Sequence, residues 1–539
     1  MLKKFMAVFI VAMLALWSFV GCGPKGPNQY GDKIVIQVGI YNGGWGQEWL
    51  DKAAAEFEKK NPQYKVLVDG DKKYYMSTLL GTIDVLPQDV FVAPVYLYDY
   101  LSQDLLMDVT TEMTTPLKDL GIGVSDEESI ADKMWEDLDE FYKGYNNLDK
   151  YFAAPFGGGI YGISYDIDLF EKKGFYYDAS GNWTKGKEGT QPKSVGQDGI
   201  AGTYDDGLPV TIDEFWNLCN YMVNEGVTPF IWSDQTSYTC NLIYSMYAAY
   251  EGKANFDLVK TMSGEYTFEG DSEPTKITPQ NAYLLMNMTG RKKALEFAYT
   301  LANNPDYYHS QSGTASMSFM TTQSEYLLSV VNESLGLGKR VAFIIDGAHW
   351  YNEAKDTFDD MAAMSDEYAN RRFGIMPFPK YEGSPATKAT YFASSFYTSV
   401  FVKKNAKEAE GAKKFFAYLQ SDEALQMCTQ YSGMPRALDY EMKDEQLAAM
   451  PDYYQSLWGA FGGNSDIVYH TCANPYIYKN EQFFEGDWKW KANTRDGKTL
   501  SDPIGDFRTY PTLTVDEYMT ALRETMSEEV WLSKIAVGN

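Results

Sequence analysis

Aromatic and polar side chains follow several of the strands that hydrophobic patterning predicts in this chain. Trp45 lies on a glycine-rich loop after the first predicted strand, and Tyr96 follows the third. Pockets carry few such groups, on loops at the carboxyl ends of strands. Tyr and Trp have an apolar face and a polar edge, which suits the faces and hydroxyls of a sugar. The candidate ligand-binding residues are Trp45, Tyr96, Phe156, Tyr161, Trp232, Asp346, His349, Trp350, Phe392, Ser395, Phe396 and Arg436.

Each candidate also has a purely structural interpretation. The chain contains 42 Tyr and 12 Trp, so many rings must be ordinary core or surface residues. Phe392 and Phe396 have the residue type of core positions. His349 could be a hydrogen-bonding neighbour of the site, and Arg436 could form a surface ion pair. Residue type and position therefore predict a sugar-binding pocket but leave open which side chains line it.

A polar, turn-rich segment at residues 176–210 carries three aspartates close to glycines. Asp198, Asp205 and Asp206 lie among Asp-Gly turns with many free backbone carbonyls. Hard cations such as Ca²⁺ prefer carboxylate and carbonyl oxygens, so these residues are candidate ligands of a structural calcium ion, although their spacing is not that of an EF-hand. A solvated loop of Asp-Gly turns is the alternative interpretation. No other cofactor is expected.

Catalytic motifs are missing from the sequence. It contains no Gly-x-Ser-x-Gly elbow, HExxH motif or Walker loop, and its three histidines, His309, His349 and His470, lie in unrelated contexts. The competing class is a secreted glycoside hydrolase, which needs two carboxylates placed across a cleft. With 74 acidic residues some pair is always present, so the presence of carboxylates decides nothing.

Length and charge exclude some functions. A chain of 539 residues is too long for one compact core and suits two large lobes. The formal net charge of −27 repels phosphate backbones, so nucleic acid is not expected as a partner. The acidity otherwise favours solubility and argues only against a polyanionic ligand.

The N-terminal residues predict the compartment. Two lysines at positions 3 and 4 precede an apolar stretch at 5–16, which is typical of a secretory signal peptide. The sequence Phe19-Val-Gly-Cys22 resembles a bacterial lipobox, with Phe19 in place of the usual Leu. We expect Cys22 to be lipidated and to anchor the protein to the outer face of the cell membrane. A plain signal peptide with an incidental cysteine is the alternative.

Four cysteines remain after removal of such a signal peptide: Cys219, Cys240, Cys428 and Cys472. In an oxidising compartment they could form two disulfides with three possible connectivities. Pairing of neighbours, Cys219 with Cys240 and Cys428 with Cys472, is the simplest expectation. No spacing suggests a zinc site.

Apolar patterning predicts an α/β fold. Strands are expected at 33–40, 64–68 and 89–92. Apolar residues three and four apart predict a helix over 48–60, which Asn61-Pro62 ends. Strand, helix, strand is the opening of a lobe with a largely parallel sheet flanked by helices.

Several short motifs follow one another in an order that resembles a known family. Each motif is weak alone, because short α/β segments recur by chance, but their order is specific. The segments are Tyr151-Phe-Ala-Ala-Pro-Phe156, Gly162-Ile-Ser-Tyr-Asp166, 169–174, Thr211-Ile-Asp-Glu-Phe-Trp216, 338–350, Phe373-Gly-Ile-Met-Pro-Phe-Pro379, 402–419, 421–424 and Gly433-Met-Pro435. Over about residues 31–440 the chain is similar to the family 1 extracellular solute-binding proteins.

The resemblance implies a two-lobed fold in which crossing segments near 154–157, 372–376 and 436–440 join the lobes. The polar segment 176–210 would be an insertion relative to short members. The expected parts are a signal peptide at 1–21, a tether at 22–32, a first lobe at 31–155 and 375–438, and a second lobe at 156–374 and 439–539.

The resemblance also implies capture of a solute without chemistry. Family members of this kind hand a carbohydrate, here expected to be an oligosaccharide, to the permease subunits of an ABC transporter. Trp350 lies on a turn that the family uses for its ligand, so it is the leading candidate for ring stacking. We expect a monomer that is not an enzyme. A lipid-anchored glycan-active enzyme, a binding protein for a non-sugar solute and a structural surface lipoprotein are the alternatives.

Overall fold

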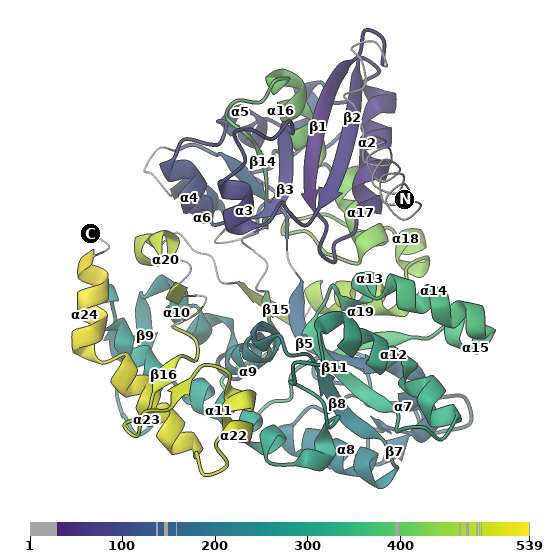
Figure 1. Cartoon of the computed structure of the whole chain (residues 1–539), viewed down its shortest axis with the longest axis vertical. Coiled ribbons are helices and arrows are strands. Elements are labelled where there is room, and N and C mark those ends of the chain that lie inside the picture. Colours follow the sequence, from purple (N-terminus) through teal and green to yellow (C-terminus); the bar gives the residue numbers. More distant parts are fainter. Residues whose placement is uncertain are drawn as a thin grey trace, which may run out of the picture.

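The computed structural model shows an α/β protein with two lobes, one above the other in Figure 1. The predicted two-lobed α/β class is confirmed, but the main sheet of each lobe mixes parallel and antiparallel pairs and is not largely parallel as predicted. The predicted signal peptide, Cys22 and most of the tether lie outside the residues that the structure describes. These are residues 30–135, 138–144, 149–157, 159–393, 398–462, 465–469, 474–480, 483–484, 486 and 488–537.

The first lobe is built on a five-stranded sheet in the order β2-β1-β3-β14-β4. β1 runs parallel to β2 and β3, while β14 is antiparallel to β3 and β4. The predicted opening strands and helix are confirmed within a few residues. The bounds are β1 Ile34–Tyr41, β2 Tyr64–Asp71, β3 Val90–Pro94, β4 Ala153–Pro155 and β14 Thr398–Val402.

Helix α2 (Glu48–Lys60) shows why this lobe folds as its sequence predicts. Its apolar residues recur on one face and are buried, and Phe57 packs against Tyr64 and Phe415. Asn61 ends the helix, since its side-chain amide donates a hydrogen bond to the Phe57 carbonyl. The other helices of this lobe are α3 Met76–Leu80, α4 Leu97–Ser102, α5 Thr110–Thr114, η1 Leu117–Leu120, α6 Leu138–Gly144, α16 Ala409–Tyr418 and α17 Asp422–Ser432.

The second lobe is built on a six-stranded sheet in which β5 is central. β5 is antiparallel to β11 on one side and to β12 and β13 on the other. β11 continues parallel to β8, and β13 continues parallel to β15. The bounds are β5 Ile160–Asp166, β8 Thr228–Trp232, β11 Val341–Gly347, β12 Phe373–Met376, β13 Ala389–Ala393 and β15 Ser465–Tyr469.

Sheet membership corrects one predicted lobe boundary. The expected return to the first lobe at residue 375 falls inside β12, and both β12 and β13 pair within the second-lobe sheet. β14 is the strand that joins the first-lobe sheet. Consecutive apolar strands look alike in the sequence, because local patterning does not encode which strand each will pair with.

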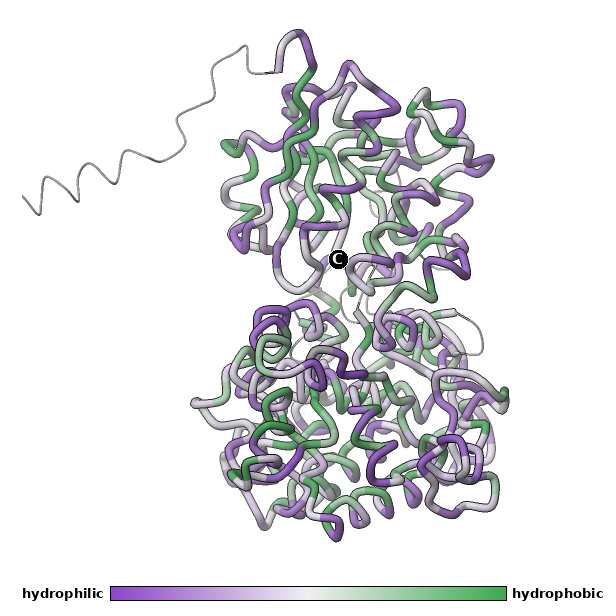
Figure 2. The backbone as a smooth tube through the Cα atoms, turned by 90° about the vertical axis from the view of Figure 1, so that its right-hand side faces the viewer, coloured by the Kyte–Doolittle hydropathy of each residue, from purple (hydrophilic) through white to green (hydrophobic). Residues whose placement is uncertain are grey.

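Helices cover both faces of the second sheet. Along β11, Ile344 packs in one buried cluster while Phe343 and Ile345 pack in the other. Figure 2 shows hydrophobic segments inside each lobe and hydrophilic ones on the periphery. The remaining elements are β6 Tyr176–Tyr177, β7 Trp183–Thr184, β9 Gly264–Tyr266, β10 Thr275–Ile277, β16 Ala492–Asn493, β17 Thr499–Leu500, α7 Ile167–Lys173, α8 Ile212–Asn224, α9 Thr236–Phe256, α10 Leu258–Thr261, η2 Pro279–Asn287, α11 Thr289–Ala302, η3 Pro305–Tyr307, α12 Phe319–Ser334, α13 Trp350–Glu353, α14 Lys355–Met364, α15 Asp366–Ala369, α18 Asp444–Ala448, α19 Asp452–Phe461, α20 Pro475–Lys479, α22 Pro503–Thr509, α23 Val515–Thr525 and α24 Glu528–Val537. Among the described helices, none combines the length and apolar character that crossing a membrane requires.

The cysteines correct the predicted disulfides. Cys219, Cys240 and Cys428 are free thiols, so the expected Cys219–Cys240 bond is wrong. Cys219 and Cys428 are fully buried among apolar side chains of α8 and α17, where each acts as a small hydrophobic residue. Cys472 lies outside the described residues, and Cys428 is not bonded to it.

Candidate functional site

The two lobes contact each other where the loop after β1 meets the end of β11. Gly44 of the first lobe lies so close to His349 of the second that an added Cβ would come within 2.8 Å of the histidine Cβ. Nearby, the Lys72 ammonium lies 5.8 Å from the centroid of the Phe319 ring across the same boundary. We call the residues around this contact the interlobe cluster: Tyr41, Trp45, Tyr75 and Phe156 from the first lobe, and Tyr161, Tyr238, Asp346, His349 and Glu353 from the second.

The first lobe contributes a series of packed rings to the interlobe cluster. The Tyr41 ring lies 5.3 Å from Trp45 and 5.2 Å from Tyr75, and Trp45 lies 5.3 Å from Phe156. Trp45 and Phe156 are buried, whereas Tyr41 is half-buried and Tyr75 is 41% exposed. The buried rings therefore support the two tyrosines, which are the accessible ones.

The second lobe contributes two further tyrosines. The Tyr238 ring at the start of α9 lies 6.4 Å from Tyr161 and 6.4 Å from the His349 ring. Tyr161 is buried and Tyr238 is half-buried. Burial raises the pKa of Tyr238, and the nearby charges of Asp346 and Glu353 raise it further, so its hydroxyl stays protonated and can donate.

A buried carboxylate forms the polar centre of the cluster. Asp346 is 2% exposed, and its Oδ1 accepts a hydrogen bond from the Gly347 amide at 2.7 Å. The Gln323 amide nitrogen donates to Asp346 Oδ2 at 3.1 Å and to Glu353 Oε2 at 2.9 Å. Burial, followed by the charge of Glu353, raises the pKa of Asp346 well above its ordinary value. The two carboxylates thus share one neutral donor.

Three glycines surround the imidazole of His349. A Cβ on Gly347 would collide with the ring, and one on Gly159 would come within 3.6 Å of Nδ1. Gly44, with a φ of +87°, approaches from the other lobe. Only glycine accommodates both that backbone conformation and that approach, so these residues determine where the ring lies.

Trp350 does not have its predicted role. Its side chain is fully buried, and its Nε1 donates to the Ser164 hydroxyl at 3.1 Å. The rings of Tyr326, Phe373 and Tyr453 surround it. The chain turns into α13 after His349, which directs Trp350 beneath the sheet into the core rather than toward the other lobe.

Arg436 is also a core residue rather than a ligand-binding or surface one. It is fully buried, and its guanidinium donates to the carbonyls of Phe156, Pro155 and Leu419. It also donates to Gln420 Oε1 at 2.6 Å. The side chain therefore satisfies backbone acceptors where the chain leaves β4, and both predicted roles are wrong.

The remaining predicted ligand residues are either core residues, half-buried or outside the described residues. Phe392 is fully buried against Tyr244 at 5.1 Å, which agrees with its core interpretation. Trp232 is 2% exposed and lies 5.0 Å from Tyr308, so it too is packed inside its lobe. Tyr96 is half-buried where α4 begins. Ser395 and Phe396 lie outside the described residues.

The predicted calcium ligands do not converge. Asp205 Oδ2 accepts from the Gln197 and Asp198 amides at 2.7 and 3.1 Å, and Asp206 Oδ2 accepts from the Gly202 amide at 2.7 Å. Asp198 Oδ1 accepts from the Ile200 amide in the same way. The carboxylates are used to hold the loop's own turns, so the alternative interpretation fits and the calcium site is not supported.

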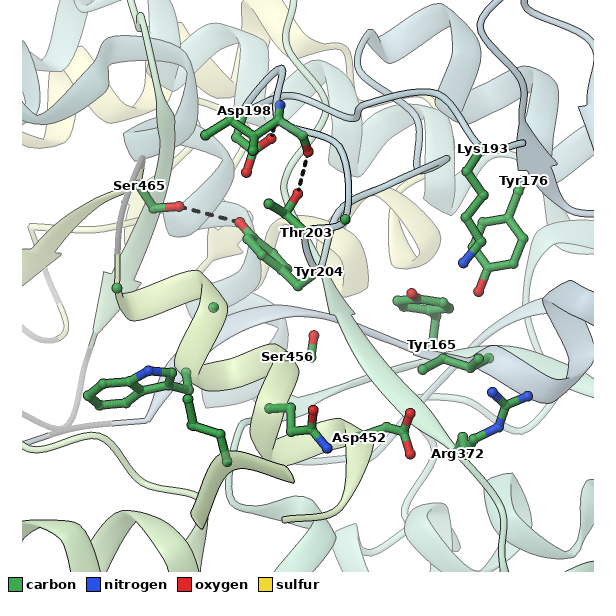
Figure 3. A pocket seen from close by; sticks show the side chains of 18 of the residues that line it. Tyr165, Tyr176, Lys193, Asp198, Thr203, Tyr204, Arg372, Asp452, Ser456 and Ser465 are labelled. Carbon is green, nitrogen blue, oxygen red and sulfur yellow. Dashed lines mark hydrogen bonds between the residues drawn. The ribbon is translucent and has the colours of Figure 1, made fainter. Parts of the chain in front are cut away.

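A cavity of about 590 Å³ lies on the second lobe, between the 176–210 segment and α19 (Figure 3). Tyr165, Tyr204 and Lys193 line it together with Asp452 of α19. Of its carboxylates, Glu171 accepts a hydrogen bond from Arg372, and Asp198 accepts one from the Ile200 amide. Of the predicted site residues only Asp198 borders this cavity, which does not reach the interlobe cluster.

Sequence reasoning missed five residues of the site: Tyr41, Tyr75, Tyr238, Gln323 and Glu353. Two signals pointed to some of them. Tyr41 precedes the glycine loop that contains Trp45, and Glu353 follows His349 by four residues, a spacing that places side chains on one side of a helical turn. Tyr75, Tyr238 and Gln323 carry no local signal.

Comparison with known families identifies the class of protein. A profile of the bacterial extracellular solute-binding proteins matches residues 52–452, well over half of the chain. The chain belongs to this family, so the resemblance to solute-binding proteins is confirmed. No curated protein is significantly similar in sequence.

Solved structures share the fold at low sequence identity. RafE in complex with raffinose is 16% identical, with a TM-score of 0.51 over 92% of this chain and 100% of that one. A chitin oligosaccharide binding protein is 14% identical, with a TM-score of 0.52 over 92% and 99%. A structure from work on xylan utilisation by Caldanaerobius polysaccharolyticus is 12% identical, with a TM-score of 0.53 over 92% and 100%. These similarities show that the two-lobed solute-binding fold is shared.

Proposed function

We propose that this protein captures a carbohydrate, expected to be an oligosaccharide, between its lobes and delivers it to the permease of an ABC transporter. The observation that carries the proposal is the interlobe cluster, in which accessible tyrosines of both lobes lie around a buried aspartate. Tyr41 and Tyr75 come from the first lobe and Tyr238 from the second. Such rings stack on the apolar faces of sugars, while carboxylates and amides bind hydroxyls.

The structural neighbours support a carbohydrate as the solute class. Their descriptions name raffinose, a chitin oligosaccharide and xylan utilisation. At identities of 12–16% they do not define which sugar this chain binds, because a shared fold does not determine the chemistry of the site.

Lobe closure would couple capture to delivery. The Gly44–His349 contact joins the lobes on one flank, and on another Tyr478 of α20 lies 4.9 Å from Phe141 of α6. Both contacts would separate when the lobes rotate apart about the segments near 154–157 and 436–440. A solute that binds the closed form more tightly shifts the population toward it, and the permease would recognise that form.

We propose that the protein is a monomer attached to the membrane through a lipid on Cys22. This anchor would hold it beside the permease. Mass spectrometry of the mature N-terminus from native membranes checks it, with a diacylglyceryl-modified Cys22 as the expected result and an unmodified terminus as the contradicting one.

Calorimetric titration with a glycan panel tests the central proposal. We expect one class of oligosaccharide to bind, and Tyr41→Ala to weaken its affinity by about 10- to 100-fold because a stacking face is lost. Tyr299→Ala, a change at an exposed tyrosine of α11, is the matched control and should bind as the unmodified protein does.

Two results would contradict the proposal. Equal affinity of folded Tyr41→Ala and Tyr299→Ala would remove the interlobe cluster from the site. If chromatography detects shorter sugars released from the bound glycan, the protein is a glycan-active enzyme instead.

A further inference from the structure

Two carboxylates in the interlobe cluster have no positive partner. Asp346 and Glu353 share the neutral amide of Gln323, and in the described part of the chain no lysine or arginine forms an ion pair with either. Uncompensated charge at a buried position is costly, and proteins usually offset it with a cation or a proton. A bound cation or a proton is therefore needed to offset the charge at this position.

His349 completes a set of three potential metal ligands. One ligand atom from each of Asp346, His349 and Glu353 lies within 4.8 Å of the other two. Ligands on opposite sides of a cation bound at about 2.0–2.4 Å are about 4–5 Å apart, so one ion can reach all three. Among the described residues, no other group of His, Cys, Asp and Glu side chains meets this condition.

The histidine nitrogen provides an independent sign of a missing ligand. Nδ1 of His349 is buried and has no hydrogen-bond partner in the structure. Buried polar atoms are nearly always satisfied, and a neutral imidazole nitrogen is a common metal ligand. The three surrounding glycines hold the ring in place, and Gln323 holds both carboxylates, as a residue behind the metal ligands commonly does.

We propose that Asp346, His349 and Glu353 bind a divalent transition-metal cation, such as Zn²⁺ or Mn²⁺, on the second-lobe side of the interlobe boundary. One imidazole and two carboxylates suit these ions better than Ca²⁺, which takes oxygen ligands alone. Three protein ligands leave coordination positions open. The metal site does not depend on the identity of the solute.

Protons compete with the metal at this position. The two carboxylates must be ionised and the imidazole neutral for binding. The groups that act on Asp346 include Glu353 of α13, Gln323 of α12, Tyr238 of α9, Tyr453 of α19 and the neighbouring His349. Metal affinity should therefore weaken as the pH falls.

Isothermal titration of the chelator-treated full-length protein with Zn²⁺ and with Mn²⁺, in the absence of sugar, tests the site. We expect one ion per chain, and at least a 30-fold loss of affinity in Asp346→Asn and in Glu353→Gln. His309→Gln, at a histidine outside the cluster, is the matched control and should bind as the unmodified protein does. Circular dichroism checks that each variant folds.

X-ray absorption of the zinc complex keeps the test independent of the variants. A first shell of one imidazole nitrogen and oxygen atoms is expected. A sulfur shell would assign the ion to cysteine thiols of the chain and overturn the proposal. The proposal would also be overturned if neither ion bound with a stoichiometry of one per chain, or if the cluster variants bound it as tightly as the unmodified protein. Either result would indicate that a shared proton offsets the charge. None of these outcomes bears on glycan binding by Tyr41.

Discussion

Two aspartates near opposite ends of the neighbouring strands β5 and β11 occupy contrasting environments. Asp166 ends β5 and Asp346 lies near the end of the antiparallel β11, and both are almost completely buried. Asp166 contacts Arg340 at 2.5 Å and Arg371 at 2.6 Å, whereas Asp346 receives only neutral donors. Asp166 is thus a charge-compensated structural residue at the strand end away from the other lobe. Asp346 is an uncompensated carboxylate at the strand end that faces the other lobe.

The pKa shifts have opposite directions for the same reason. Burial raises the pKa of Asp166, but the charges of Arg371 and Arg340 outweigh this and lower it below its ordinary value. At Asp346 burial and Glu353 act together and raise the pKa. The difference indicates that a buried carboxylate is available for a ligand or an ion when no cation of the protein occupies its place.

Removing the compensated charge should have the largest effect on stability. Asp166→Asn leaves two buried arginines without their carboxylate, while the Asn Oδ1 can still accept the Leu169 amide hydrogen that caps α7. We expect a loss of about 3–5 kcal/mol in the free energy of unfolding, measured by urea denaturation. A loss below about 1 kcal/mol would show that the arginines do not depend on Asp166.

The substitution Trp350→Phe, at a core residue that contacts β5, should have a smaller effect on stability. Ser164 on β5 accepts the indole hydrogen of Trp350, so Trp350→Phe removes one buried hydrogen bond and reduces the ring. We expect a loss of about 1–3 kcal/mol in stability with unchanged glycan affinity. Weaker glycan binding by the folded variant would restore Trp350 to the site.

Asp346→Asn should have the smallest effect on stability, and of opposite sign. In metal-free buffer the change removes an uncompensated charge and keeps a hydrogen-bonding side chain of the same shape. We expect a free energy of unfolding that is unchanged or raised by up to about 1 kcal/mol. Destabilisation comparable to that of Asp166→Asn would indicate that a positive group compensates Asp346, and the contrast between the two aspartates would then be wrong.

The pH dependence should distinguish the two aspartates as well. The stability that Asp166 contributes is present above its unfolded pKa and is lost as the pH falls through the lowered folded value. For Asp346, with its raised folded pKa, stability is lost as the pH rises through that value. The advantage of Asp346→Asn over the unmodified protein should therefore shrink between pH 8 and pH 5. Melting curves in metal-free buffer measure it, and a constant difference would contradict the raised pKa.

Much of the fold could be predicted from local pattern. The helix at Glu48–Lys60 and the strands around it follow from apolar spacing and a helix-ending Asn, which act over a few residues. The site was predicted only in part. The predicted residues Trp45, Phe156, Tyr161, Asp346 and His349 belong to the interlobe cluster. Trp350 and Arg436 belong to the core, because burial depends on what packs over a residue.

The sequence by itself determined the family and the α/β class. Tertiary structure decided what each side chain does there. Asp166 and Asp346 both follow apolar strand residues and look alike locally, but the arginines that neutralise Asp166 lie 174 and 205 residues away along the chain. Charge compensation acts through space over a few ångströms, so only the folded chain reveals which aspartate is paired and which is left for a ligand.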